Sequence, residues 1–229
     1  MLFRNLDLLF SNPTAFFILI ASLAAALVVA ITIHEFSHAL AARTLGDTTA
    51  ERLGRLSLNP ARHLDPAGTL LLLVAGFGWG KPVPVDPRLM RGNPRTSMSL
   101  VSLAGPASNI LTAVVLGSLF RFAVLPEPNG SAAVFGRDPL SMVAYVVSLA
   151  VLFSVILAVF NMIPLWPLDG FKVLLGILPE EQAQSLAKVQ MHGPLILMGV
   201  VFADIALGLG ILNTILGPPI DILISAFMG

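Results

Sequence analysis

Long apolar runs alternate with short charged stretches along this chain. A helix rises 1.5 Å per residue and needs about 20 apolar residues to cross the hydrocarbon core of a bilayer. The runs that reach this length cover about residues 13–45, 98–120, 140–160 and 194–216. The pattern therefore predicts an all-α polytopic membrane protein with about four transmembrane helices, in a single membrane-embedded domain over residues 1–229. The tail, residues 218–229, is expected to lie on the membrane or to cross it in part.

The first of these helices should have well-defined ends. Asn12 followed by Pro13 is typical of a capped helix N-terminus with proline in the first turn, and Gly46 is typical of a helix C-terminus. The apolar run between them lacks a small-residue cleavage site, so we interpret it as a retained membrane helix rather than a signal peptide.

Residues 67–90 do not fit a regular span. The apolar part is short, has three glycines after position 75, and leads into a proline-spaced stretch at residues 81–87. Basic residues flank the segment on both sides, so the positive-inside rule places both flanks on the cytoplasmic face. We therefore expect a re-entrant segment here. The preceding residues, 47–66, alternate polar and apolar positions, which favours short strands and turns.

Charge and composition set the orientation and narrow the chemistry. Of the 13 lysines and arginines, only Arg4, Arg121 and Arg137 lie away from the side on which the first helix ends, which leaves 10 on that side. This bias predicts that the first helix ends in the cytoplasm. The formal net charge is zero, which gives no indication of a nucleic-acid partner, and the chain has no cysteine. Any metal ion must therefore be held by histidine and carboxylate side chains.

The first helix contains a His-Glu-x-x-His motif at residues 34–38. Helical positions i and i+4 lie on one face, so His34 and His38 can offer two ring nitrogens to one metal ion. Glu35 is rotated by about 100° from this face, where its carboxylate can take a proton from metal-bound water. Such a short motif can occur by chance. However, charged groups inside a membrane helix cost about 2.5–3.5 kcal/mol each, so we predict a metal site of the zincin type.

A third ligand must come from elsewhere, and Asp169 is the best candidate. The third span ends in the sequence NMIPLWPLDG at residues 161–170, where two prolines so close together cannot continue a helix. This span runs in the same direction as the first helix, so Asp169 arrives at a similar depth. The other candidates, which we interpret as solvated or hydrogen-bonded groups, are His63, His192 and Asp204.

Two asparagines leave alternatives open. Asn161 could bond the substrate carbonyl or the oxyanion, or it could cap backbone groups at the helix break, and the residues alone do not decide between these roles. Asn109 follows Gly105 and Pro106, where the proline predicts a helix kink. It has the same two possible roles, and we favour the structural one.

These motifs resemble the site-2 protease family of intramembrane zinc metalloproteases. The resemblance rests on His-Glu-x-x-His, on Asn-x-x-Pro-x-x-Pro-x-Asp-Gly, and on motifs between them in the same order, over about residues 30–175. The connecting motifs are Gly54-Arg55-Leu-Ser-Leu-Asn-Pro, Asp65-Pro-x-Gly-Thr, Gly-Trp-Gly-Lys81-Pro-Val-Pro-Val and Leu-Ala-Gly105-Pro106. Phe171-Lys172 stands where many members carry glycine and arginine, and Trp166 stands where a smaller residue or proline is common.

The resemblance implies a zinc metalloendopeptidase that cleaves within or near a transmembrane segment of a membrane protein substrate. It implies that His34, His38 and Asp169 hold one zinc ion per chain, that Glu35 is the general base, and that Asn161 contacts the substrate.

It further implies a multi-pass protein in the lipid bilayer of a bacterial or archaeal cell, with its active site towards the cytoplasm. Residues 67–90 would form a partly β, membrane-embedded hairpin or sheet that pairs with an unwound substrate. The chain leaves no room for the PDZ or CBS domains of some relatives. The sequence does not identify the substrate or the oligomeric state.

Two other functions fit parts of the pattern. A metal or proton transporter could use the same histidines and acids as a relay, but it predicts inverted repeats and a polar path to both faces, which the sequence lacks. A catalytically inactive binding protein of the same fold is disfavoured because Glu35 and the three predicted ligands are all present.

Overall fold

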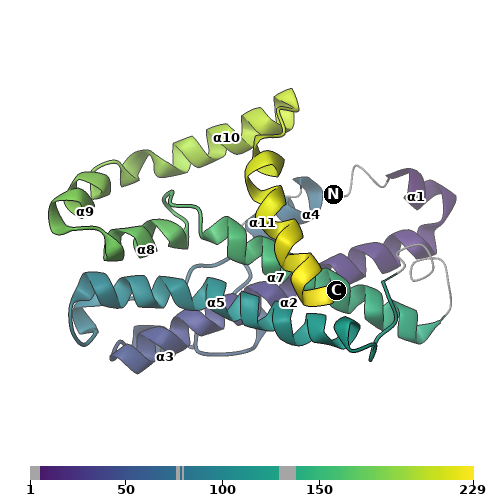
Figure 1. Cartoon of the computed structure of the whole chain (residues 1–229), viewed down its shortest axis with the longest axis horizontal. Helices are drawn as coiled ribbons and strands as arrows, with labels where there is room; N and C mark the ends of the chain where they lie inside the picture. Colours follow the sequence, from purple (N-terminus) through teal and green to yellow (C-terminus); the bar gives the residue numbers. More distant parts are fainter. Residues whose placement is uncertain (1–5, 76–77, 79, 129–137) are drawn as a thin grey trace.

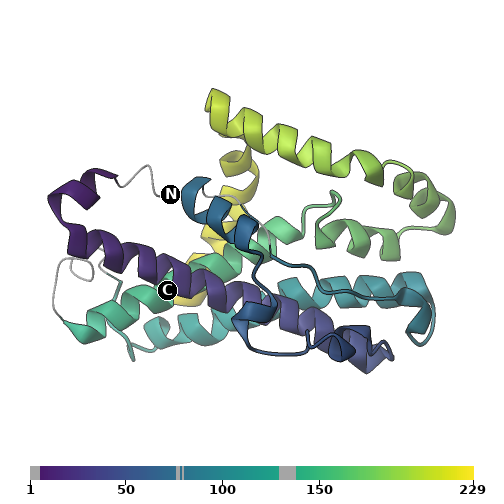
Figure 2. The same cartoon turned by 180° about the vertical axis from the view of Figure 1, so that it is seen from behind.

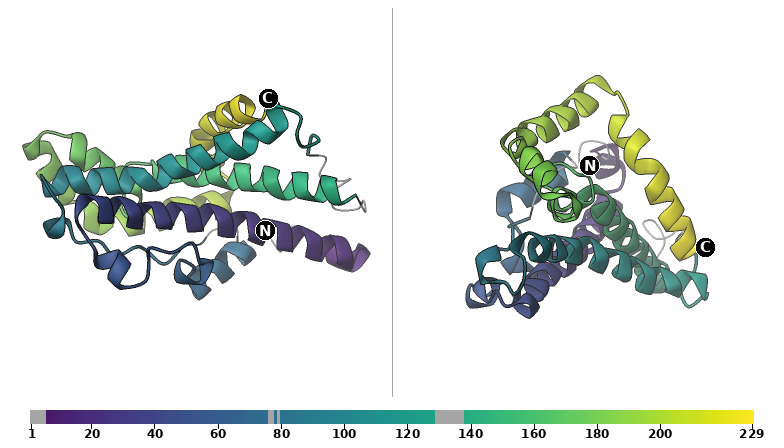
Figure 3. Two further views of the ribbon diagram at one scale, coloured as in Figure 1. Left: turned by 90° about the horizontal axis from the view of Figure 1, so that it is seen from below. Right: turned by 60° about the vertical axis from the view of Figure 1, so that its left-hand side comes forward.

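Three long helices form the centre of the molecule. The computed structural model describes residues 6–75, 78, 80–128 and 138–229. Within it, α2 (Pro13–Leu45), α5 (Pro94–Arg121) and α7 (Pro139–Asn161) each pack against the other two. They lie side by side along the long axis of the molecule (Figure 1; Figure 3, left). Small side chains such as those of Ala26, Ala30 and Ala150 are buried between them, which lets the helices approach closely.

Helix α2 has the bounds that its sequence predicts. The Asn12 side chain accepts a hydrogen bond from the amide of Ala15 (3.1 Å), and Pro13 occupies the first turn. At the other end Gly46 has a φ of 114°, a left-handed conformation that glycine adopts without steric cost. A short helix, α1 (Leu6–Ser11), precedes it.

More helices can cross a membrane than the four predicted. In the described part of the chain, five helical stretches are long and apolar enough to do so. They are Pro13–Leu45, Pro94–Arg121, Pro139–Asn161, Glu180–Leu207 and Ile211–Met228. The fourth stretch joins α9 (Glu180–Ala187), the 3-10 turn Gln190–His192 and α10 (Gly193–Leu207). These stretches indicate a multi-pass membrane protein.

The span predicted at residues 194–216 is wrong as a single helix. The chain turns between α10 and α11 (Ile211–Met228), because Gly208 and Gly210 both take left-handed φ values, 62° and 68°. The Asp204 carboxylate accepts a hydrogen bond from the amide of Ile211 (2.5 Å), so it caps α11. Helix α11 contains the tail and packs against α5 and α7.

The predicted β structure is not supported by the residues that the structure describes. Residues 47–66 contain a short helix, α3 (Thr49–Arg52), and a 3-10 turn at Pro60–Arg62, and α4 (Pro66–Ala75) occupies the start of the expected re-entrant segment. Asp65 explains α4, because its side chain accepts from the amide of Gly68 (2.8 Å) and so caps the helix.

The remainder of that segment has little regular structure. The described residues after α4 form an isolated antiparallel bridge between Gly80 and Leu64, an extended stretch, and a 3-10 turn at Pro87–Leu89. A partly β element at residues 67–90 is therefore not supported. Residues 76, 77 and 79, and residues 129–137, lie outside the described residues.

Helix α7 ends at Asn161 and α8 (Asp169–Ile177) begins eight residues later, which confirms the predicted break. Gly170 makes the close packing at this break possible, since a Cβ there would overlap the Met162 carbonyl and lie 2.7 Å from the Ile163 oxygen. Helix α8 packs against α5, so Asp169 faces the central helices. Helix α10 packs Leu197 and Val201 against Leu168, the residue before Asp169. Figure 2 shows the ribbon of α10 passing above that of α8.

A buried arginine ties the residues before α4 to those after Gly80. The guanidinium of Arg55 donates to the carbonyls of Arg62, Lys81 (3.4 Å) and Pro82 (3.2 Å). The Lys81 amide donates to the carbonyl of His63 (2.7 Å). These contacts fix the start of the extended stretch, which approaches the C-terminal half of α2.

We expect Arg55→Ala to lower the thermal stability of the protein in detergent, because it leaves three carbonyls without their donor. The loss should be on the order of 2 kcal/mol. Arg52→Ala, at an exposed position on α3, is the matched control and should change stability by less than about 0.5 kcal/mol. Equal melting temperatures for Arg55→Ala and the control would show that Arg55 does not hold these segments together.

Candidate metal centre

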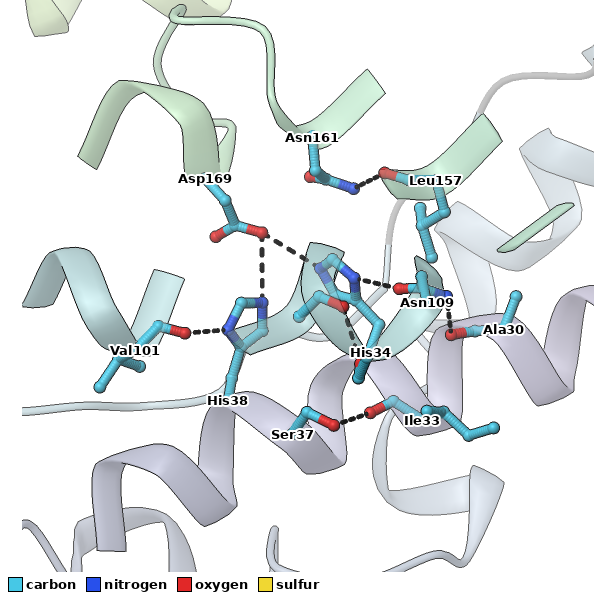
Figure 4. A network of polar contacts seen from close by, with 12 residues as sticks. Ala30, Ile33, His34, Ser37, His38, Val101, Asn109, Leu157, Asn161 and Asp169 are labelled. Carbon is cyan, nitrogen blue, oxygen red and sulfur yellow. Dashed lines mark hydrogen bonds and ion pairs between the residues drawn. The ribbon is translucent and has the colours of Figure 1, made fainter. Parts of the chain in front are cut away.

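The predicted ligands meet in the interior of the molecule. His34 and His38 lie one turn apart on α2, both buried, with ring centroids 4.6 Å apart. Asp169, the first residue of α8, reaches across to them (Figure 4). Its Oδ2 atom lies 3.1 Å from the Nε2 atom of His34 and 3.2 Å from that of His38. The structure thus brings together three side chains from two segments far apart in the sequence.

Helix α5 supplies an acceptor for the other nitrogen of each ring. The Nδ1 atom of His38 donates to the backbone carbonyl of Val101 (2.7 Å). The Nδ1 atom of His34 donates to Asn109 Oδ1 (2.6 Å), since the Asn109 amide nitrogen donates in turn to the carbonyl of Ala30 (3.1 Å). With both Nδ1 atoms acting as donors, a ring that carries no second proton has the lone pair of its Nε2 atom directed towards Asp169.

This donor set fits a metal ion. Two imidazole nitrogens and a carboxylate oxygen lie within 4.8 Å of one another. When each ring carries its proton on Nδ1, all three atoms have lone pairs that one cation can accept. Imidazole and carboxylate together suit zinc. In the part of the chain that the structure describes, no other group of three histidines or acids is this close. His63, His192 and Asp204 do not belong to the cluster.

A glycine on α5 makes room beside the ring nitrogens. A Cβ at Gly105 would overlap the Nε2 atom of His38 and lie 2.7 Å from Cε1 of His34. The space next to the two rings is therefore available only because residue 105 has no side chain.

The centre opens into a cavity of about 140 Å³. Glu35 and Asn161 both line it, together with His34, His38 and Asp169. The Asn161 amide donates one N–H to the Leu157 carbonyl in the last turn of α7 (2.9 Å). The other lining residues are Pro82, Val83, Val85, Met98, Val101, Ser102, Pro167 and Lys172. All five residues that the sequence analysis selected thus border one space.

The sequence analysis missed the contribution of α5. It assigned Asn109 a structural role and gave Gly105 no role in the site. Their spacing carried a signal, because Val101, Gly105 and Asn109 follow one another at intervals of four residues and so share one face of a helix. The same interval separates Ala30, His34 and His38 on α2.

Comparison with known proteins agrees with this geometry. The family model described as Peptidase family M50 matches residues 132–205, the stretch that contains Asn161 and Asp169. The "Putative zinc metalloprotease YwhC" of Bacillus subtilis is 39% identical over 171 residues, which cover 73% of this chain and 74% of the relative. The chain belongs to peptidase family M50, the site-2 protease family. It is accordingly a zinc metalloprotease of the site-2 type.

Two Rip2 proteins with the same kind of name are also similar to this metalloprotease. That of Mycolicibacterium smegmatis is 34% identical over 174 residues, 73% of this chain and 61% of the relative. That of Mycobacterium tuberculosis (strain H37Rv) is 29% identical over 199 residues, 84% of this chain and 71% of the relative. No solved structure matches the chain.

We expect Gly105→Ala to abolish zinc retention by the purified metalloprotease, because the added methyl group overlaps the Nε2 atom of His38. The matched control is Gly199→Ala on α10, where a Cβ would meet no atom within 4 Å. Zinc per chain, measured by mass spectrometry after gel filtration, should stay at the wild-type level in the control. Full zinc retention by a folded Gly105→Ala protein would contradict the close approach of α5 to the histidines.

Proposed function

We propose that this metalloprotease hydrolyses a peptide bond within or near a transmembrane segment of a membrane protein, as in regulated intramembrane proteolysis. One observation carries the proposal. His34, Glu35 and His38 lie in a helix that is long and apolar enough to span a bilayer, and Asp169 of α8 meets the two histidines there. In this proposal the whole chain, residues 1–229, forms one membrane-embedded protease domain.

In the proposed site, His34, His38 and Asp169 hold one zinc ion per chain. When bound, zinc supplies Lewis-acid chemistry, which lowers the pKa of water and polarises a carbonyl group. The Nδ1 hydrogen bonds to α5 keep both rings oriented so that Nε2 faces the ion. The carboxylate of Asp169 contributes the negative charge that partly offsets the charge of the ion in this buried setting.

Glu35 and Asn161 are proposed to act on the substrate. The Glu35 carboxylate lies in the cavity, where it takes a proton from the attacking water and delivers it to the leaving nitrogen. The Asn161 amide has a second N–H besides the one donated to Leu157, and this N–H donates to the oxyanion that develops on the scissile carbonyl. Capping of the last turn of α7 and contact with the substrate are thus compatible roles.

The surroundings of the site favour an unwound substrate. A helical peptide hides its carbonyls in its own hydrogen bonds, so it must unwind before the scissile bond can be attacked. The extended residues Pro82, Val83 and Val85 line one side of the cavity with apolar surface. That surface suits the apolar side chains of a transmembrane segment.

Two variants should distinguish the loss of zinc binding from the loss of proteolytic activity. Glu35→Gln removes the proposed base but no proposed ligand, so it should keep about one zinc per chain and lose activity by about 10²–10⁴-fold. Asp169→Ala should lose both zinc and activity. The measurements are metal analysis of purified protein and cleavage of a panel of single-pass membrane peptides reconstituted in the same vesicles. The proposed intramembrane proteolysis would be contradicted by a wild-type protein that binds zinc but cleaves none of these peptides faster than Glu35→Gln does.

We also propose that the active site lies towards the cytoplasm, because the histidines occupy the half of α2 that ends at the Arg-rich side. The cysteine-free chain allows a direct test with single cysteines at exposed positions. In intact cells, a membrane-impermeant maleimide should label Val124→Cys, after α5, and leave Glu181→Cys, in α9, unlabelled until the cells are lysed. The reverse labelling pattern would place the site on the outer side.

A further inference from the structure

We propose that Asn109 is a positioning residue, which selects the metal-binding tautomer of His34. This inference rests on the metal site of the proposed function. Asn109 is completely buried on α5 and is not among the residues that line the cavity beside the metal centre. Its two polar atoms both form hydrogen bonds with α2, one with His34 and one with Ala30. Its influence on a metal ion must therefore act through His34.

The oxygen and the nitrogen of the Asn109 amide form hydrogen bonds with different residues of α2. The nitrogen donates to the Ala30 carbonyl (3.1 Å), which fixes the amide so that its oxygen faces His34. That oxygen can only accept, so the ring must place its proton on Nδ1, at 2.6 Å. The Nε2 atom lies 3.1 Å from Asp169 Oδ2, and in a neutral ring with its proton on Nδ1 this Nε2 atom is free to bind a metal ion. Asn109 thus spans one turn of α2, from the backbone of Ala30 to the ring of His34.

The second histidine is oriented differently. The proton on Nδ1 of His38 goes to a backbone carbonyl, that of Val101, which no substitution removes. Of the two acceptors that orient the rings, only Asn109 is a side chain. Hydrogen bonds to the non-ligating nitrogen of a metal-bound histidine typically change metal affinity by about 10–100-fold. Asn109 is therefore the position at which zinc affinity can be altered without changing a ligand.

A purely structural Asn109 would behave differently from a positioning one. Asn109→Leu removes both the acceptor to His34 and the donor to Ala30 while keeping the number and branching of the side-chain heavy atoms. Asn109→Asp keeps the acceptor to His34 and removes the donor to Ala30. If the residue positions His34, only Asn109→Leu, which loses the acceptor, should lower the zinc affinity. Both variants lose the donor to Ala30, so both should lower the thermal stability. If it only links α5 to α2, the two variants change stability and leave zinc affinity alone.

The experiment measures the zinc dissociation constant of the full chain in detergent by competition with a chelator. We expect Asn109→Leu to bind zinc about 10–100-fold more weakly than wild type, and Asn109→Asp to stay within about threefold of it. Thr112→Val is the control, because it removes a hydroxyl that donates to Ser108 (2.8 Å) one turn further along α5. Its zinc affinity should be unchanged. The visible spectrum of the cobalt-substituted protein should change in Asn109→Leu alone.

Wild-type zinc affinity in a folded Asn109→Leu, or equal losses in the Leu and Asp variants, would overturn the inference. Nitrogen NMR of the histidine-labelled wild type provides a test that needs no folded variant. His34 should carry its proton on Nδ1, and a proton on Nε2 in the zinc-loaded protein would overturn the assignment. A wild type that binds no zinc would overturn this inference and the metal site together, whereas a zinc-binding wild type without proteolytic activity would overturn the proposed function alone.

Discussion

The convergence of one carboxylate oxygen on two imidazole nitrogens is the constraint around which the fold is arranged. Polar groups inside a membrane protein are costly unless they have partners, and here the two rings and the carboxylate have theirs on different elements. The two rings come from α2, the carboxylate from the first residue of α8, and the Nδ1 acceptors from α5. None of these three elements could be displaced by even a few ångströms without leaving a buried polar atom unpaired.

Close approach of the helices is what makes this convergence possible, and it depends on residues that lack a large side chain. Gly105 lies against the two rings, and Gly170 lies against the backbone at the end of α7. Helices in membranes gain most of their association from such close packing, since lipid is as apolar as a leucine side chain. The catalytic geometry and the stability of the bundle therefore draw on the same small residues.

The parts that sequence predicted well are those governed by the local backbone. Asn12, Pro13 and Gly46 bound α2 by capping rules, and two nearby prolines end α7 before Asp169. The alternation of polar and apolar positions predicted secondary structure poorly where a helix cap was present. At Asp65 the side chain caps a helix, although the alternation favoured strands and turns. The paired glycines between α10 and α11 were overlooked within an apolar run. The spacing of Gly105 and Asn109 places both on one face of α5, but their roles depend on which helix lies opposite, and no local pattern encodes that.

The position of Asp169 in the chain has a consequence for biosynthesis. It lies 135 residues after His34 and follows the third of the long central helices. A growing chain therefore displays its His-Glu-x-x-His motif long before the last member of the donor set has been translated. The three ligands can meet only after α2, α5 and α7 have been made, so a chain interrupted before that point carries an incomplete centre. The order of synthesis itself delays the assembly of a hydrolytic site until the helices that enclose it exist.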